Sequence, residues 1–428
     1  MLDAVQREAF GYFLHEGNAQ NGLIADKTSP GSPASIAAVG FALSAYPVSV
    51  ERKWLSRADA SARALATLRF FNASVQSSGP DASGYNGFYY HFLDMQSGRR
   101  VWDCELSTID SAILLAGMLT AAAYFSHESD EEREIRTLAN RLYLRADWNW
   151  ARNGGATVTH GWKPGTGFLK YRWEGYCEAL ILYLLGLGSP THPLPAESYK
   201  RWTETYTWRN IYDQAFVYAG PLFIHQFSHI WIDFRGIRDD YMRDKRSDYF
   251  ENSRRATLAQ RQYAIANLSR FVGYGADCWG IPASDGPGPA RYTTRGEQRR
   301  YFGYLARGAP DGPDDGTLAP WAVAASLPFA PEVVGPALRH FKALNLRENN
   351  PYGFDTTFNA TIAERSGLSE PWVSPFHFGI NQGPVILMIE NHRTGFVWDI
   401  MRNCPYLVDG LRRAGFSGGW LNGHPCSA

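Results

Sequence analysis

The sequence of 428 residues predicts an all-α fold in which helical hairpins form a ring and long loops at one end form a cleft. Eleven segments carry apolar residues at helical spacing. No alternating run of β-branched residues is long enough for a major sheet. The connecting loops are rich in Gly, Pro, Asp and aromatic residues, so we expect at most short strands, for example at Gly167-Phe168-Leu169.

The predicted helices follow one another along the whole chain. In the first half they cover residues 1–17, 35–46, 56–71, 107–125, 131–147 and 171–187, and Pro47 is expected to end the second of them. In the second half they cover 196–206, 247–271, 319–326, 332–344 and 383–393. Because no linker or low-complexity segment interrupts this order, residues 1–428 are expected to form a single catalytic domain. A central sheet of four or more strands would contradict this prediction.

The charge balance and the missing motifs exclude several classes of function. The chain has 42 basic and 42 acidic residues, whereas nucleic acids and anionic membranes bind strongly basic surfaces. It contains no run of eighteen apolar residues, so we expect no membrane span. The motifs GxGxxG, GxSxG, HExxH and the P-loop are absent, which argues against nucleotide-binding, lipase-type and zinc-protease functions. The five scattered cysteines suggest neither a disulfide framework nor a zinc site, and Cys104 and Cys177 are expected to be buried thiols.

Aromatic residues make up 14% of the chain, including 14 Trp, which suits a carbohydrate cleft as well as a core. The segment 171–194, YRWEGYCEALILYLLGLGSPTHPL, places Glu174 and Glu178 four residues apart, on one face of the predicted helix. Trp173 and Tyr176 lie beside them. Carboxyl groups transfer protons in glycoside hydrolysis, and aromatic rings stack on sugars. The alternative, with equal weight, is that these acids stabilise the helix dipole.

A second acidic segment, residues 89–110, reads YYHFLDMQSGRRVWDCELSTID. Asp110 matches a capping box at the start of the next helix, which gives it a structural alternative. Glu105 precedes the cap and is therefore freer for chemistry. The candidate sugar ligands in this segment are Tyr90, His91 and Asp103.

Three further polar segments supply binding candidates. His225 and His229 are four residues apart, like a metal pair, but no Glu lies between them, so hydrogen bonding to sugar hydroxyls is the preferred interpretation. Arg235 is a candidate that could instead pair with Asp233. In WGIPASDGP, Asp285 follows Trp279, and an Asx turn is the alternative for this aspartate. His192, in a turn fixed by two prolines, is a candidate whose alternative is a plain helix stop.

Ten motifs occur in the order in which one protein family has them. They are NGLIADKT, ASIAAVGFAL, YYHFLDMQSGRRVW, ELSTIDSAILLAG, WEGYCEALILYLLGLGSPTHPL, FIHQFSHIWIDFRG, WGIPASDGP, DGTLAPWAVAASLPFAP, YGFDTTFNA and NQGPVILMIENHRTG. Together they resemble the bacterial "putative glucoamylase" family, from about Leu2 to Phe416. This family includes the endo-β-1,2-glucanases of glycoside hydrolase family 144 and is similar to the cyclisation domain of cyclic β-1,2-glucan synthases.

The resemblance implies an (α/α)6 toroid, β-1,2-glucan as substrate, and no metal or cofactor. It places Glu178 at the family's essential Glu, and Asp110 and Glu105 in its other acid-bearing motif. One departure is Asn381, where the family often has Asp before Gln-Gly-Pro; this change could alter the activity or a subsite.

We therefore expect an endo-β-1,2-glucanase that inverts the anomeric carbon and releases short sophoro-oligosaccharides. Glu178 would be the acid, with Asp110 or Glu105 on the side of the base. The alternatives are a transglycosylase and a glucan-binding protein without turnover, for which Asn381 is the support. We expect a monomer in the periplasm or secreted, with its signal outside this chain; a cytoplasmic location is the alternative.

Overall fold

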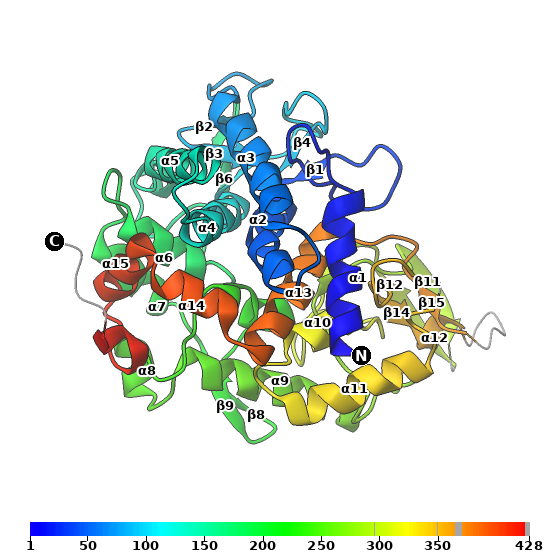
Figure 1. Cartoon of the computed structure of the whole chain (residues 1–428). Coiled ribbons are helices and arrows are strands. Elements are labelled where there is room, and N and C mark those ends of the chain that lie inside the picture. The colour runs from blue at the N-terminus through cyan, green and yellow to red at the C-terminus, as the bar shows by residue number, and fades with distance from the viewer. Residues whose placement is uncertain (295, 349, 364–369, 424–428) are drawn as a thin grey trace.

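The computed structural model describes residues 1–294, 296–348, 350–363 and 370–423, and is mostly helical with short strands (Figure 1). The α-helices are α1 (Leu2–His15), α2 (Ile36–Glu51), α3 (Arg57–Ala73), α4 (Thr108–Tyr124), α5 (Asp130–Arg145), α6 (Leu180–Gly188), α7 (Ala196–Thr203), α8 (Asp240–Asp244), α9 (Tyr249–Ala266), α10 (Pro320–Ala325), α11 (Pro331–Ala343), α12 (Ala360–Ala363), α13 (Gly379–Arg393), α14 (Phe396–Arg402) and α15 (Pro405–Arg413). The 3-10 segments are η1 (Trp150–Arg152), η2 (Leu222–His225), η3 (Phe227–Ile230) and η5 (Gly419–Gly423).

The helix starts follow from local sequence. The side chains of Ser35, Ser56, Ser107 and Ser129 accept hydrogen bonds from backbone N–H groups at the starts of α2, α3, α4 and α5. These bonds satisfy donors that have no partner within the helix. The helix cap predicted at Ser107 is therefore confirmed, but the Asp110 side chain accepts a hydrogen bond from Oγ of Ser107, which is not the reciprocal backbone bond of a capping box.

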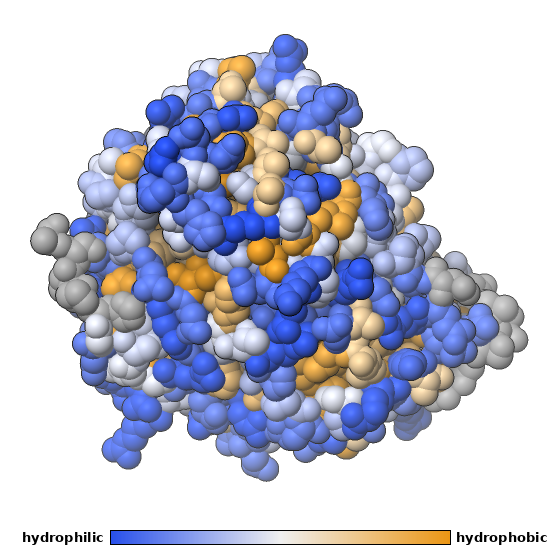
Figure 2. Space-filling model, in the orientation of Figure 1, coloured by the Kyte–Doolittle hydropathy of each residue, from blue (hydrophilic) through white to orange (hydrophobic). Residues whose placement is uncertain are grey.

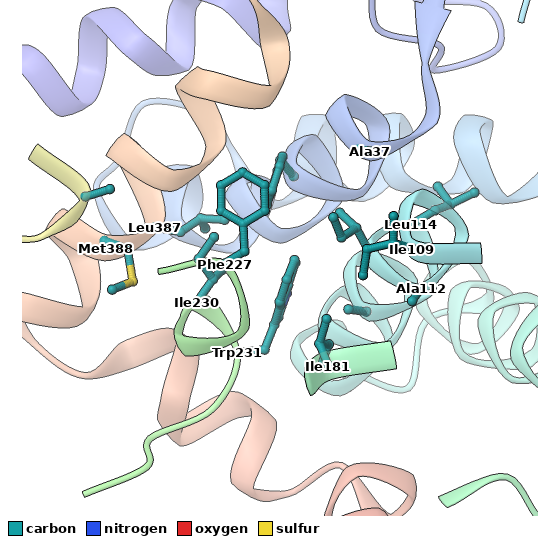
Figure 3. Packing of buried hydrophobic residues seen from close by; sticks show 14 of the residues in the cluster. Ala37, Ile109, Ala112, Leu114, Ile181, Phe227, Ile230, Trp231, Leu387 and Met388 are labelled. Carbon is teal, nitrogen blue, oxygen red and sulfur yellow. The ribbon is translucent and has the colours of Figure 1, made fainter. Parts of the chain in front are cut away.

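The long apolar helices pack around one hydrophobic core. α2 packs against α4 and α13, α4 packs against α6, and α13 packs against α10 and η3. On the outside of these helices, α1 lies on α13, α3 lies on α2, α5 lies on α4, and α15 lies on α6. Figure 3 shows side chains from several of these elements in the core: Ala37 of α2, Leu114 of α4, Ile181 of α6, Leu387 of α13, and Trp231, which directly follows η3.

Two glycines allow α2 and α4 to approach closely. A Cβ atom on Gly117 would lie 2.1 Å from the carbonyl oxygen of Gly40, and a Cβ on Gly40 would lie 2.4 Å from the carbonyl oxygen of Ile113. Neither distance is possible without moving a backbone, so the contact between these helices depends on glycine at both positions.

The strands are short and lie in the loops. They are β1 (Ala34–Ser35), β2 (Gly84–Tyr85), β3 (Phe88–Tyr90), β4 (Phe92–Leu93), β5 (Leu106–Ser107), β6 (Gly161–Lys163), β7 (Gly167–Phe168), β8 (Trp208–Ile211), β9 (Gln214–Val217), β10 (Ala283–Ser284), β11 (Ala290–Thr294), β12 (Glu297–Tyr301), β13 (Leu305–Ala306), β14 (Phe358–Asn359) and β15 (Trp372–Val373). Five of them form one antiparallel sheet in the order β2-β3-β5-β6-β7. Its strands have two or three residues each. The sheet lies beside α3 and α5 in Figure 1 and ties together the loops before α4 and α6.

Several predicted helix bounds are wrong for local reasons. Residues 171–179 are not helical: Gly175 has a left-handed φ of 70°, and Arg172 forms a β-bridge with Thr159, so α6 begins only at Leu180. Glu174 and Glu178 therefore do not share a helix face. Pro47 does not end α2, which continues to Glu51, because the helix is buried on all sides from Ile36 to Ser49 and its packing outweighs the lost hydrogen bond. α13 begins at Gly379, four residues before the predicted start.

The face of the molecule in Figure 2 is mainly hydrophilic, with scattered apolar patches. Much of the aromatic content lies inside, where Trp148, Trp202, Trp231 and Trp279 are fully buried. Cys104 and Cys177 are buried free thiols, as predicted. Among the described residues, no helix is both long and apolar enough to cross a membrane.

Candidate active site

A cavity of about 480 Å³ opens among the loops that precede α2, α4, α6 and α13. Seven of the predicted site residues line it: His91, Glu105, Asp110, Trp173, Glu178, Asp285 and Asn381. They come from five motifs and lie up to 290 positions apart in the chain, so the fold brings together side chains that the sequence separates widely.

Glu178 lies in the turn directly before α6, with its main chain fixed by η3. Its carbonyl oxygen accepts a hydrogen bond from Oγ of Ser228 at 3.2 Å, and the same Oγ accepts one from the N–H of Ile181 at 3.0 Å. The side chain of Glu178 is thereby held at the cavity wall by rigid elements.

The protonation of Glu178 follows from its surroundings. Burial raises the pKa of the Glu178 carboxyl to about 7, and the negative charge of Asp110 raises it as well. A carboxyl group with this pKa is about half protonated at pH 7 and mostly protonated below it, and the protonated form is the state that a general acid requires.

Asp110 and Glu105 lie on either side of His91. Nδ1 of His91 is 2.9 Å from Oε1 of Glu105, and Nε2 is 3.6 Å from Oδ2 of Asp110. The Oγ of Ser107 donates a hydrogen bond to Oδ2 of Asp110 at 2.5 Å, which orients this carboxylate. The helix cap and the site thus share one residue: Asp110 belongs to the capping turn of α4 and also faces the cavity.

The positive charge of His91 and the negative charges of the nearby carboxylates stabilise each other. Burial would lower the pKa of His91, but the carboxylates of Asp110, Glu105 and Asp26 outweigh it and raise the pKa to about 9. Burial would raise the pKa of Glu105, but the hydrogen bond and charge of His91 outweigh it and lower the pKa. An imidazolium flanked by carboxylates therefore lies near the protonated Glu178.

Aromatic rings form another wall of the cavity. The rings of His160 and Trp173 stack at 3.9 Å, and Nε1 of Trp173 donates a hydrogen bond to Oγ1 of Thr108 at 2.9 Å. Burial lowers the pKa of His160, so this ring is neutral near pH 7. Flat apolar faces of this kind, next to carboxyl groups, suit the C–H surfaces of a sugar.

Asp285 and Asn381 complete the predicted lining residues. Oδ2 of Asp285 accepts a hydrogen bond from Oγ of Ser374 at 2.8 Å, so the carboxylate is held by more than an Asx turn. Asn381 lies in the first turn of α13 and is only 2% exposed. Its Nδ2 is buried and has no hydrogen-bond partner among the described residues.

The other predicted binding residues do not line this cavity. His225 and His229 are buried: Nε2 of His225 lies 3.2 Å from the carbonyl oxygen of Ala219, and Nε2 of His229 lies 2.9 Å from Oγ of Ser253. Burial lowers the pKa of both histidines, to about 4 and about 3. Tyr176 packs among buried rings beside His225. These three side chains support the wall behind Glu178 from within the core.

The remaining candidates lie at the surface or in other parts of the core. Arg235 forms a bidentate ion pair with Asp233, the alternative that its sequence left open. Glu174 is exposed and accepts a hydrogen bond from Thr157. Three others also lie outside the cavity wall: the exposed Asp103 and His192 and the buried Trp279. Tyr90 is buried under the guanidinium group of Arg100.

Sequence reasoning missed several lining residues, of which Asp26 is the most important for chemistry. Burial raises the pKa of the Asp26 carboxyl to about 6, against the lowering effect of His91 and Lys27. The loop that carries it is tied to the start of α13, because the carbonyl oxygen of Asp26 accepts a hydrogen bond from the N–H of Gly379. The motif NGLIADKT contained this residue, but nothing in its local pattern indicated a cavity. Tyr304 and His160 were missed in the same way.

The described part of the chain contains no group of three or more His, Cys, Asp or Glu side chains arranged to hold a metal ion. The side chains that line the cavity include carboxyl groups, the imidazole of His91, Lys27 and aromatic rings.

Comparison with known proteins gives consistent matches over this region and beyond it. The family model described as "Putative glucoamylase" matches residues 170–405. An "Exo beta-1,2-glucooligosaccharide sophorohydrolase (non-reducing end)" from Parabacteroides distasonis is 28% identical over 453 residues, which cover 96% of this chain and 57% of that protein. The chain thus spans a little over half the length of this curated relative.

Two crystal structures show the same fold at higher coverage of this chain. A "putative glucoamylase" from Bacteroides uniformis has a TM-score of 0.86 and 31% identity, and the match covers 98% of each chain. A beta-1,2-glucanase from Parabacteroides distasonis has a TM-score of 0.83 and 26% identity, covering 97% of this chain and 59% of that one.

Proposed function

The chain belongs to the "Putative glucoamylase" family, and from this membership and the cavity we propose that it is a glycoside hydrolase that cleaves β-1,2-linked glucan. The substrate is proposed because the names of two relatives specify β-1,2-linked glucose polymers or oligosaccharides. The observation that carries the reaction type is Glu178, a carboxyl group with a pKa of about 7 that lines the same cavity as the Glu105 carboxylate paired with His91.

In the proposed reaction, the carboxyl of Glu178 donates its proton to the glycosidic oxygen as the bond from that oxygen to the anomeric carbon breaks. A water molecule forms the new bond to this carbon and gives its proton to a carboxylate. We assign that role to Asp110, which Ser107 orients, with Glu105 as the alternative. The charge of His91 stabilises the ionised state of Glu105. Nε2 of His91 also lies 3.6 Å from Oδ2 of Asp110. Carboxyl oxygens that can accept a proton therefore line the same cavity as Glu178.

We also infer how the helices are arranged around the cavity that holds Glu178, Asp110 and Glu105. The contacts of α2, α4, α6, η3, α10 and α13 support an inner ring of helices, and the helices outside them support an outer one. This is the (α/α)6 toroid expected from the sequence, with the cavity among the loops at one end.

The mode of cleavage has two candidates. Endo-cleavage with inversion, giving short sophoro-oligosaccharides, is the mode expected from the sequence. Exo-release of sophorose is favoured by the name of the curated relative. Products from linear β-1,2-glucan at early times distinguish them, since endo-cleavage gives a mixture of lengths and exo-cleavage gives one disaccharide. Anomeric NMR of the first product separates inversion from retention and transglycosylation.

Glucan binding without turnover is the second candidate function. Asn381 favours it, because its amide replaces the acid often found at this position and cannot accept a proton from water. The test is the release of new reducing ends from linear and cyclic β-1,2-glucan, with laminarin, cellulose and starch as controls. Release from β-1,2-glucan alone supports the proposed hydrolase. Binding of β-1,2-glucan without release of reducing ends supports the second candidate. Release of reducing ends from laminarin, cellulose or starch contradicts the proposed substrate.

We propose that the enzyme acts in the periplasm or outside the cell, where soluble glucan of this linkage is met. Fractionation of the native cells with an antibody against the chain tests this location.

A further inference from the structure

Trp102 stands at the rim of the cavity with an unusually open side chain. It is 63% exposed, whereas Trp173 and Trp321 of the cavity wall are 9% and 5% exposed. A tryptophan whose indole ring is exposed gives up the favourable free energy that burial of the ring would provide. Packing in the hydrophobic core therefore does not account for the position of Trp102.

The ring of Trp102 continues a row of aromatic rings that begins beside the catalytic carboxylates. His91 and Phe92 stack at 4.0 Å with their planes 12° apart, and Phe92 lies 5.1 Å from Trp102. His91 faces Glu105, so the row leads outward from the reacting groups to the surface.

The backbone holds Trp102 in this position despite an unfavourable conformation. Trp102 and Asp103 have φ values of 58° and 48°, a region that residues with a Cβ rarely adopt. The loop is fixed on both sides: the N–H of Val101 donates to the carbonyl of Phe92 at 3.2 Å, and Nε of Arg100 donates to the carbonyl of Cys104 at 2.6 Å. Strain of this kind persists only where surrounding contacts enforce it.

A second cavity of about 800 Å³ continues from the first at this point, and Lys27 and Trp102 line both. Its walls are residues 15–33 on one side and 94–102 on the other. The walls are joined, because Nδ2 of Asn18 and Nδ2 of Asn21 both donate to the carbonyl of Met95, at 2.9 and 3.0 Å. We call this second cavity the outer groove.

The outer groove is polar, unlike the aromatic cavity. The polar side chains along it are Glu16, Asn18, Gln20, Lys27, Thr28, Ser29, Ser32, Asp94 and Gln96. It thus offers donors and acceptors for hydroxyl groups along a preformed path, with an indole face at its inner end.

We propose that Trp102 and the outer groove form a remote binding site for a β-1,2-linked glucan chain whose reacting end lies at Glu178. This inference rests on the proposed function for the identity of the polymer. A sugar stacks on Trp102, and the next residues of the chain follow the groove. Trp102 stands at the rim of the inner cavity and the groove lies beyond it. A substrate long enough to extend from Glu178 past the rim therefore gains contacts with Trp102 and the groove that a substrate confined to the reacting groups does not.

The first experiment compares Trp102→Ala with the wild-type protein on long linear β-1,2-glucan and on the shortest sophoro-oligosaccharide that the wild type cleaves. We expect kcat/KM on the long substrate to fall roughly tenfold, mainly through KM, because one stacking contact is lost. On the short substrate the loss should be less than about threefold. Trp102→Phe, which keeps an aromatic face, should restore most of the activity on the long substrate.

Tyr212→Ala is the matched control. Tyr212 is also an exposed aromatic residue with a left-handed φ, of 52°, but it lies in the β8–β9 turn, outside both cavities. The Tyr212→Ala variant should have the wild-type kcat/KM on both the long and the short substrate. Equal losses on long and short substrates with Trp102→Ala, or no loss on either, would overturn the inference.

A binding measurement separates this inference from the proposed hydrolysis. Affinity electrophoresis in gels that contain long β-1,2-glucan should retard the wild-type protein, and Trp102→Ala should be retarded much less. If the wild type is retarded but cleaves nothing, the proposed hydrolysis fails and the binding site stands. If the wild type cleaves the glucan and Trp102→Ala is retarded equally, the binding site fails and the hydrolysis stands. If neither protein is retarded and nothing is cleaved, both fail.

Discussion

Nδ1 of His91 lies 2.9 Å from Oε1 of Glu105, on the side of the imidazole opposite to Asp110. His91 directly follows β3, and Glu105 directly precedes β5. The contact places the positive charge of His91 between the carboxyl groups of Glu105 and Asp110. This charge affects both the stability of the fold and the protonation of the site.

The pH dependence of stability should report on His91. Burial opposes the charge of His91, but neighbouring carboxylates raise its pKa from 6.5 to about 9. A pKa raised in the folded state gives stability that is full below pH 6.5 and is lost as the pH rises through 9. The difference in the free energy of unfolding between the wild type and His91→Gln should therefore be on the order of 3 kcal/mol at pH 6 and shrink towards pH 10. Urea unfolding at several pH values measures it. His192→Gln, at an exposed histidine, should show no such trend, and a pH-independent difference for His91→Gln would refute this role.

The pH–rate profile should have its alkaline limb at Glu178. Burial raises the pKa of this carboxyl to about 7, and the acid works only while protonated, so kcat/KM should fall as the pH rises through about 7. Initial rates on β-1,2-glucan between pH 5 and pH 9 give the limb. An alkaline limb more than about two pH units away would indicate a different acid.

The contact between α2 and α4 should not tolerate a larger residue. In Gly117→Ala, the added methyl group meets the carbonyl of Gly40, and we expect a loss of about 1–3 kcal/mol in the free energy of unfolding. Gly335→Ala in α11 is the control, since the nearest atom to its added Cβ is the end of the Arg339 side chain at 3.6 Å. It should be neutral or stabilising by up to about 1 kcal/mol. Chemical denaturation of both variants compares them directly, and equal effects would contradict the close packing.

A fully buried ion pair supports the loop that carries Tyr304 to the cavity. Arg307 and Asp315 are both 0% exposed and form a bidentate pair, with Nε of Arg307 2.8 Å from Oδ1 of Asp315. Arg307→Met leaves a buried carboxylate without its partner and should cost about 3–5 kcal/mol. Thermal unfolding tests this cost against Arg209→Met, which removes the exposed pair with Asp311 and should cost less than about 1 kcal/mol. Similar shifts in Tm for both variants would argue against the buried pair.

Local signals in the sequence located most helices, because caps and apolar spacing are properties of neighbouring residues. The start of α4 at Ser107 is an example. The same reasoning failed at residues 171–179, where Gly175 adopts a left-handed φ and pairing with Thr159 replaces the helix. It also failed at Pro47, where burial of the whole helix outweighs the usual effect of proline.

The site was only partly predictable, because its members meet through tertiary structure. Motifs found Glu178, Asp110, Glu105 and His91, which lie together in the cavity. They could not show that His229 would form a hydrogen bond with Ser253 in the core. Nor could they show that the carbonyl oxygen of Asp26 would accept a hydrogen bond from the first residue of α13.

The release of new reducing ends from linear β-1,2-glucan by the wild type and Glu178→Gln tests the central claim most directly. The substitution preserves shape and removes the titrating proton, so the rate should fall by at least about 10²–10⁴-fold with the Tm unchanged. Glu174→Gln, at an exposed glutamate only four residues away, should keep close to the wild-type rate. If Glu178→Gln retains more than about a tenth of the wild-type rate, a loss far below that expected for a general acid, Glu178 is not the acid. A wild-type protein that releases no reducing ends from this glucan would contradict the proposed activity itself.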